Sequence, residues 1–218
     1  VQEGTQYRLS LWVRAEAGKP GKLTASLRSK DGTLLGSSEV KGRVKSKWRH
    51  LEAVITAEGS DPQAEFVLTA EKPCTMVLDV VSLVPPTFKD RPNGCRRDLA
   101  EMLLAMRPAF VRFPGGCVVE GNIKPENAWH WERTVGPIER RPGHMNANWG
   151  YPSTDGLGFH EYLQLCEDLG AKPLYVVNVG IWHGGCTPID SLQGWIDECL
   201  AALEYANGPV TSRYGKMR

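Results

Sequence analysis

The spacing of apolar residues changes near Pro86, and this change constrains the fold more than any other feature. Before it, apolar and polar residues alternate, as in residues 7–13. After it, apolar residues recur every three or four positions. A period of two predicts half-buried strands, whereas a period of 3.6 predicts helices with one apolar face. Because the two periods occupy separate blocks, we expect two domains, residues 1–86 and 87–218.

The first block predicts an antiparallel β-sandwich, jelly-roll-like in kind. Its alternating segments are residues 7–13, 23–27, 51–55, 66–70 and 76–80. Asp31-Gly32, after the second segment, supplies a hairpin-type turn. Short strands at this spacing are typical of a sandwich, and Pro85-Pro86 marks its end. We expect the large aromatic residues Trp12 and Trp48 to pack in the core or at an edge.

The second block predicts parallel α/β structure. The predicted helices are residues 99–106, 159–170 and 192–207, and the predicted strands are residues 110–113 and 174–179. Apolar stripes such as Leu99, Met102, Leu103 and Met106 predict helix faces that are buried. The run from Leu174 to Val179 is continuous and β-branched, as in a strand buried on both faces. Two parallel strands are too few for a complete barrel, so we expect an incomplete one.

The composition is that of an ordinary soluble globular protein, with 41% hydrophobic and 23% charged residues. A net charge of +1 gives no reason to expect a nucleic-acid or membrane partner. No apolar stretch is long enough to span a bilayer, and the six irregularly spaced cysteines leave the redox compartment open. The chain starts without Met or a signal peptide and enters a strand-like pattern at once, so we expect an internal piece of a longer protein.

The segment "FVRFPGGC", residues 110–117, holds one arginine in an apolar run. Arg112 lies near the carboxyl end of a predicted parallel strand, where ligands bind in such folds. Pro114 ends the strand, and Gly115 and Gly116 allow the backbone to approach a ligand closely. Arg112 could contact substrate hydroxyls or a carboxylate, or it could form a structural ion pair beneath a tight loop. Residue types and spacing favour the two readings equally.

The loop that follows is long and rich in aromatic residues, with Trp129-His-Trp131 and Asn148-Trp-Gly-Tyr151. Long ordered loops are often functional, and Trp and Tyr rings fit the apolar faces of sugars. Packing explains any single ring more simply, but the cluster taken together favours a binding surface. Glu120, just past the double glycine, is a candidate acid, and a structural hydrogen-bonding role is an equal alternative.

Other chemistry has little support in the sequence. His183 and Cys186 are possible ligands, but no partner pair has suitable spacing, so we expect no metal and no other cofactor. No nucleophile-elbow pattern occurs. The Pro-Gly-Gly turn lacks the Lys and the Ser or Thr of a phosphate-binding loop.

Four ordered motifs are specific enough to compare with a known family: "RFPGGCVVEG", "TVGPIERRPGH", "NWGYPSTDGLGFHEYLQLCEDLGA" and "VVNVG". From about Arg91 to the C-terminus, the chain resembles α-L-arabinofuranosidases of glycoside hydrolase family 51. The resemblance is to the branch typified by plant enzymes and some bacterial ones. The first block is similar to the β-sandwich carbohydrate-binding modules found within such enzymes, and we expect this sandwich to be incomplete within the chain.

The resemblance implies a (β/α)8 TIM barrel that hydrolyses terminal non-reducing α-L-arabinofuranosyl groups from arabinan and arabinoxylan with retention. Retention needs two carboxyl groups about 5 Å apart. In the family, the acid/base belongs to an Asn-Glu pair on a later strand, and the nucleophile lies later still. Neither motif occurs here. We therefore expect the early part of a barrel glycosidase, with no catalytic residue in this chain.

The resemblance also implies roles for matching residues. Arg112 matches an arginine that supports the catalytic carboxylates. Cys117 matches a sugar-contacting position that is Asn in many relatives and Cys in the plant-like branch. Trp149 matches a tryptophan at the border of the arabinose pocket, and Asn178 matches a supportive strand-end asparagine. The expected substrate-binding residues are Arg112, Gly116, Cys117, Glu120, Trp149 and Asn178.

The expected partner is an arabinose-containing polysaccharide or oligosaccharide, and such a substrate favours an extracellular or periplasmic location. Two alternatives stay open. The chain could be a non-catalytic carbohydrate-binding protein built on the sandwich, in which case one sheet face would carry exposed aromatic residues. It could also belong to a retaining barrel glycosidase for another sugar, such as a xylosidase or an endoglucanase.

Overall fold

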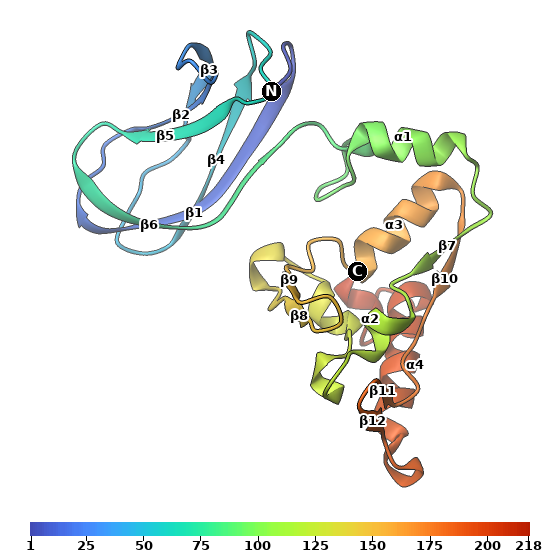
Figure 1. The fold of residues 1–218 in the computed structure, drawn as a ribbon. Coiled ribbons are helices and arrows are strands. Elements are labelled where there is room, and N and C mark those ends of the chain that lie inside the picture. Colours follow the sequence, from blue (N-terminus) through green and yellow to red (C-terminus); the bar gives the residue numbers. More distant parts are fainter. The chain divides into compact units, whose positions relative to one another are not determined.

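The computed structural model describes residues 1–218, and the chain divides into two compact units, Val1–Asp90 and Arg91–Arg218 (Figure 1). This division lies four residues beyond Pro86. No helix has both the length and the apolar character needed to cross a membrane.

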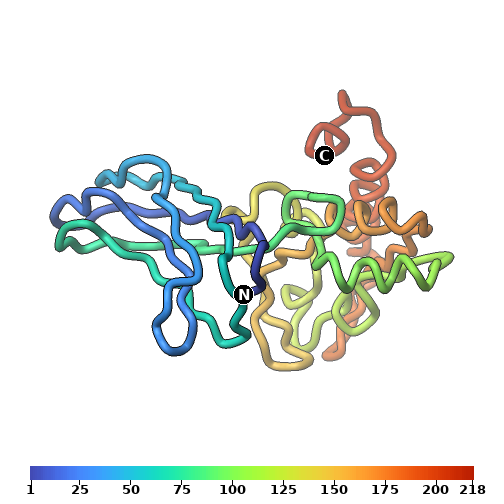
Figure 2. Tube along the Cα trace, turned by 90° about the horizontal axis from the view of Figure 1, so that it is seen from above, coloured from blue at the N-terminus to red at the C-terminus, as the bar shows by residue number.

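The first unit contains two three-stranded antiparallel sheets. One has the order β4-β1-β6, formed by Arg49–Thr56, Gln6–Gly18 and Cys74–Val84. The other has the order β3-β2-β5, formed by Leu34–Glu39, Leu23–Arg28 and Glu65–Ala70. Figure 2 shows β1 and β6 running alongside one another, as their pairing requires. The antiparallel β-sandwich expected from the period of two is confirmed.

Both sheets contribute to a single core. Leu11, Val13 and Ile55 are completely buried, and Ala25 and Leu27 of the opposite sheet are buried with them. Successive side chains of a strand point to opposite faces, so every second residue reaches this core. The period of two in the sequence is the direct consequence of this closed packing.

Trp12 and Trp48 are not core residues. Trp12 is half-buried and out of phase with the inward-facing Leu11 and Val13, and its ring centroid lies 5.3 Å from that of His50. Trp48 is 41% exposed. The core is filled by smaller aliphatic side chains, so of the two expected placements, core or edge, the core is wrong for both rings.

The second unit combines helices with a two-stranded parallel sheet. β7 (Phe110–Phe113) pairs with β10 (Lys172–Tyr175). The helices are α1 (Arg97–Ala105), α2 (Gly116–Glu120), α3 (Phe159–Leu169) and α4 (Gln193–Asn207). Short antiparallel pairs form between β8 (His144–Asn146) and β9 (Tyr151–Ser153), and between β11 (Ile181–Trp182) and β12 (Gly185–Cys186). Parallel α/β structure is present, without a closed barrel.

Single-turn 3-10 helices occupy parts of the connections. They are Phe88–Asp90, Pro125–Asn127, Trp131–Thr134, Ile138–Arg140, Ile189–Ser191 and Gly215–Met217.

Aromatic rings form the core of the second unit. Trp131, Phe159 and Tyr205 are each at most 1% exposed, and the ring centroids of Phe159 and Tyr205 lie 5.6 Å apart. Phe113 at the end of β7 stacks on Tyr162 of α3 at 4.8 Å. This core ties β7 to α3 and α4 and positions the end of the strand.

Several apolar faces of the second unit are exposed, contrary to expectation. The α1 residues Leu99, Met102 and Leu103 and its C-cap Met106 are between 41% and 75% exposed. β10 ends at Tyr175, and Leu174 and Val179 are 46% and 63% exposed. Periodicity identifies the apolar side of an element but not what covers it. In this unit no element packs on these faces, so the prediction that they are buried is wrong.

Candidate functional site

The candidate site lies where β7 ends and α2 begins. The Phe113–Pro114 peptide bond is cis, and Gly115 has a φ of +121°, which residues with side chains rarely adopt. α2 starts at the next residue, Gly116. The double glycine thus allows a sharp turn at the carboxyl end of a parallel strand.

Arg112 is exposed, and its guanidinium group lies over this turn. A Cβ atom on Gly115 would lie 3.7 Å from Nη1, and a Cβ atom on Gly116 would lie 3.7 Å from Nη2. No carboxylate of the chain pairs with Arg112, so it is not a structural ion pair beneath the loop. The turn therefore presents an unpaired positive charge to solvent.

Hydrogen bonds from two other loops hold α2 in place. Asn148 Nδ2 donates to the Cys117 carbonyl at 2.7 Å, and Asn178 Nδ2 donates to the Val119 carbonyl at 3.0 Å. Asn178 Oδ1 also accepts from the N–H of Gly180 at 2.7 Å. The Asn178 amide is thus engaged within the protein and braces the site. Asn148 was not predicted from the sequence. Its position directly before Trp149 in the motif "NWG" could have identified it as a candidate.

Trp149 lies in the turn of the β8–β9 hairpin and is 58% exposed. The N–H of Gly150 donates to the Asn146 carbonyl at 2.8 Å and closes the turn. Because the neighbouring Asn148 is bonded to Cys117, the turn that carries Trp149 is tethered to α2. The Arg112 guanidinium group thus lies over Gly115 and Gly116, and the turn that carries Trp149 is bonded to Cys117. The hairpin itself was not predicted.

The aromatic loop has two different parts. Trp129 and Trp131 are 6% and 0% exposed and belong to the core, where Trp131 Nε1 donates to the Glu198 carbonyl at 3.1 Å. Trp149 and Tyr151 are 58% and 51% exposed. The interpretation of the whole cluster as a surface is wrong for the first pair, because Trp131 packs against Phe159. It holds only for the hairpin pair.

Glu120 at the end of α2 faces His183. Its Oε2 atom lies 3.2 Å from His183 Nε2, and both side chains are about two-fifths exposed, at 38% and 40%. The partner comes from the β11–β12 turn, far along the sequence, and was not predicted. No group of three or more His, Cys, Asp or Glu side chains is placed to hold a metal ion.

A buried ion pair anchors the long loop that leads to Trp149. The side chains of Arg141 and Glu161 are 3% and 7% exposed, and Nη2 lies 2.7 Å from Oε1. Arg141 Nη2 also donates to the Gly136 carbonyl at 2.8 Å. Burial acts to raise the pKa of Glu161, but hydrogen bonds from Arg141, Asn93 and the N–H of Gly158 outweigh it and hold the pKa below its usual value. The loop is thereby fixed to the start of α3.

This arrangement can bind a small hydroxylated ligand. An exposed guanidinium group, a thiol on Cys117 and an aromatic ring are available near one turn. Sugars bind proteins through polar groups and the face of an aromatic ring. Hydrolysis with retention needs two closely spaced carboxyl groups, and α2 carries one, Glu120.

Comparison with known proteins gives a consistent result. Residues 102–218 match the family model described as the alpha-L-arabinofuranosidase 1 domain. Alpha-L-arabinofuranosidase 1 of Arabidopsis thaliana is 38% identical over 222 residues, which covers 100% of this chain and 32% of the relative. An extracellular exo-alpha-L-arabinofuranosidase of Streptomyces chartreusis is also 38% identical, over 100% of this chain and 27% of the relative.

A solved structure resembles the whole chain. The arabinose-bound MgGH51 α-L-arabinofuranosidase matches with a TM-score of 0.90 and 34% identity, over 100% of this chain and 36% of that one. The chain thus spans about a third of the length of the relatives it matches. These matches bear out the resemblance read from the motifs, and the chain belongs to the α-L-arabinofuranosidases of glycoside hydrolase family 51.

Proposed function

We propose that this chain forms the sandwich and part of the substrate site of a retaining α-L-arabinofuranosidase. The parent enzyme would remove terminal non-reducing α-L-arabinofuranosyl groups from arabinan or arabinoxylan. The observation that carries the proposal is the exposed, unpaired Arg112 at the end of β7, in a chain of this family. An arginine with no partner among these 218 residues is suited to bind a carboxylate supplied by another segment.

In this proposal Arg112 is a positioning residue. Its guanidinium group would hydrogen-bond a catalytic carboxylate and keep it ionised, because a nearby positive charge favours the charged form. Gly116 lets the backbone approach the sugar, and the Cys117 side chain would contact a sugar hydroxyl. Trp149 would border the arabinose ring, while Asn178 and Glu120 hold α2 through the contacts described above. The two catalytic glutamates would lie in segments that these 218 residues do not include.

The test is hydrolysis of an aryl α-L-arabinofuranoside by the full-length parent enzyme. Arg112→Ala is expected to remove most of the activity, by at least about a hundredfold, because a preorganised electrostatic contact is lost. Arg133→Ala is the matched control, since Arg133 is also exposed and without a side-chain partner. Equal activity of the two variants would overturn the proposal. The purified 218-residue chain should show no turnover.

Residues 1–86 are proposed to act as a carbohydrate-binding-module-like domain and residues 87–218 as the early part of a (β/α)8 barrel. The half-buried Trp12 and the exposed Trp48 favour sugar binding as a second function of the sandwich. Affinity electrophoresis of the chain on arabinoxylan, compared with Trp48→Ala, tests this. We also propose export of the parent enzyme, which the extracellular relative from Streptomyces chartreusis supports.

A further inference from the structure

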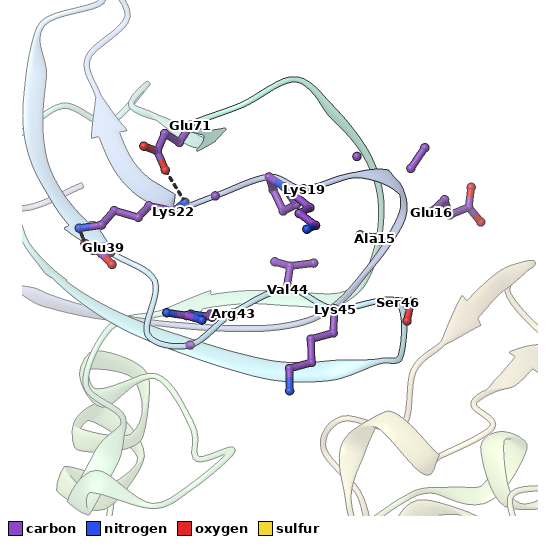
Figure 3. Close-up of a pocket in the computed structure, with 15 residues that line it drawn as sticks. Ala15, Glu16, Lys19, Lys22, Glu39, Arg43, Val44, Lys45, Ser46 and Glu71 are labelled. Atoms are coloured by element: carbon purple, nitrogen blue, oxygen red, sulfur yellow. Dashed lines mark hydrogen bonds and ion pairs between the residues drawn. The ribbon is translucent and has the colours of Figure 1, made fainter.

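A cavity at one end of the sandwich is separate from the candidate site. It has a volume of about 890 Å³ and lies between the β1–β2 connection and the segment that leads from β3 to β4. Figure 3 shows Lys19 on the first of these segments directed towards Val44 on the second. Val44 packs against the sandwich core, and the Lys45 carbonyl accepts from the N–H of Ala15 at 2.8 Å. Both walls of the cavity are therefore anchored to the fold.

Glycines shape both walls. Gly18 and Gly21 have φ values of +77° and +72°, and a Cβ atom on Gly21 would lie 2.3 Å from Oε2 of Glu71. Gly42 has a φ of +112°, and a Cβ atom there would lie 2.7 Å from Leu51 Cδ2. Residues with side chains are strained in this region of φ. The cavity thus has a defined backbone and is not a gap between unstructured loops.

The charges around the cavity do not balance locally. Its carboxylates already have partners: Glu16 pairs with Arg14 at 2.8 Å, Glu39 pairs with Lys22 Nζ at 2.9 Å, and Glu71 accepts from the N–H of Lys22 at 3.1 Å. Three lining cations have no side-chain partner, namely Lys19, Arg43 and Lys45. The segment that leads into β4 adds Lys41 and Lys47, and Arg49 follows at the start of β4. Residues 40–49 contain no acidic side chain.

An exposed aromatic ring adjoins the cavity. Arg14, which binds the cavity residue Glu16, also lies with Cζ 5.4 Å from the centroid of the Trp48 ring. Trp48 is 41% exposed and follows the cavity residue Ser46 by two positions. Trp rings pack against the apolar faces of sugars, and Lys and Arg bind carboxylates. A cavity with unpaired cations beside an aromatic ring therefore suits a ligand that carries carboxylates and the apolar face of a sugar ring.

We propose that this cavity binds an acidic saccharide through its carboxylates, that is, a uronate-bearing oligosaccharide or polysaccharide. A nucleic acid is the rival polyanion, and two observations disfavour it. The net charge of the chain is only +1, the rim also holds Glu16, Glu39 and Glu71, and a continuous row of phosphates would meet these carboxylates. A uronate polymer has neutral hydroxyls between its charges and fits a mixed rim better. Binding here does not require hydrolysis.

The test is titration of the 218-residue chain with oligogalacturonate, with its methyl-esterified form as the neutral counterpart. The acid form is expected to bind at least about tenfold more tightly, since each exposed ion pair adds a modest amount. Its affinity should fall when salt is raised from about 0.05 to about 0.5 M, because exposed charges are screened. No binding of the acid form, or equal binding of both forms, would overturn the proposal.

Variants locate the site. The double change Lys19→Ala with Arg43→Ala is expected to weaken oligogalacturonate binding about tenfold. The matched control, Lys30→Ala with Arg8→Ala, removes the same charges from exposed positions outside the cavity and should change affinity less than about twofold. Equal loss in both variants would contradict the site. Binding of a single-stranded oligonucleotide as tight as that of oligogalacturonate would contradict the saccharide assignment. Circular dichroism confirms that each variant is folded.

Discussion

The two units differ in how completely they cover their apolar surfaces. In the sandwich, the inward side chains of both sheets cover each other, and Leu11, Val13 and Ile55 are inaccessible to solvent. In the second unit a small aromatic core is complete, yet Phe110 is 57% exposed and Leu200 is 57% exposed. The sandwich closes a core of its own, although it also leaves apolar side chains such as Val54 and Val81 exposed, at 50% and 46%. The second unit has exposed apolar faces, a kind of surface on which further structure can pack.

This difference is consistent with the lengths of the relatives, of which the chain spans about a third. A parallel sheet is normally covered on both faces, and the two-stranded sheet of β7 and β10 is not. We infer that the open faces of the second unit are where the rest of a barrel would pack. An apolar cavity of about 350 Å³ between Val177, Val179 and Leu200 lies on this open side.

The largest expected effect concerns the buried ion pair. Arg141→Met should lower the free energy of unfolding of the second unit by about 3–5 kcal/mol, because Glu161 would be left as an unpaired buried charge. Chemical denaturation followed by tryptophan fluorescence measures this. The sandwich should unfold at an unchanged denaturant concentration. A loss below about 1 kcal/mol would mean that the pair is accessible to water.

A matched pair of leucines tests the comparison directly. Leu11→Ala in the sandwich should cost about 2–5 kcal/mol, because it leaves a cavity in a closed core. Leu203→Ala in α4 should change stability by no more than about 0.5 kcal/mol, since Leu203 is 52% exposed and Ala favours helix. Thermal unfolding of both variants gives the two values. Similar costs would show that the α4 face is covered.

Acid should unfold the second unit before the sandwich. Burial lowers the pKa of His160, and the pKa of Glu161 is held below its usual value despite burial, by Arg141 and its other partners. Both groups are less protonated in the folded state, so their stabilisation is complete above the unfolded pKa values, about 6.5 and 4.3, and is lost as pH falls. In the sandwich the carboxyls whose pKa is lowered are Asp31, which is exposed, and Asp61, which is half-buried.

Near-ultraviolet circular dichroism against pH, read with fluorescence of the buried Trp131, follows this acid transition. Glu161→Gln is the comparison, because it removes the titrating group while keeping its shape. Its stability should be lower at neutral pH and should fall less steeply in acid. Loss of both units at one pH, in wild type and variant alike, would contradict the expectation.

The smallest expected effect on stability is that of oxidising exposed methionines. Met102 and Met106 are 67% and 75% exposed, so peroxide should oxidise them first, while Met76, which packs against the sandwich core, should react more slowly. Oxidation at the two exposed sites should change stability by less than about 0.5 kcal/mol. Peptide mass spectrometry gives the rates. Equal rates at Met76 and Met106 would refute the difference in packing.

Much of the fold could be predicted from periodicity. The helices α1, α3 and α4 and five of the six sandwich strands lie close to where the apolar pattern places them, whereas β3 was not predicted. Gly170, with a φ of +67°, caps the end of α3. These features are local, because they depend on which side of an element is apolar and on residues that stop helices. The turn at Gly115 and Gly116 is local in the same sense.

The remainder depends on contacts between distant segments. The pairing of Glu120 with His183 and the bond from Asn148 to Cys117 join positions that no spacing rule connects. The exposure of Leu99 and Val179 could not be predicted either, because an apolar stripe is identical whether or not another element covers it. Trp131 and Trp149 have the same chemistry and opposite environments, which only the tertiary structure distinguishes.

Hydrogen exchange, measured on the 218-residue chain and on the proposed full-length parent enzyme, tests the central claim most directly. The account predicts that amides of α1, β7 and α4 exchange more slowly in the parent enzyme, because further structure packs on their open faces, while those of β1 and β4 exchange at the same rate in both. Equal exchange of α1, β7 and α4 in the two proteins would contradict it, because those faces would then be exposed to solvent in the parent enzyme as well.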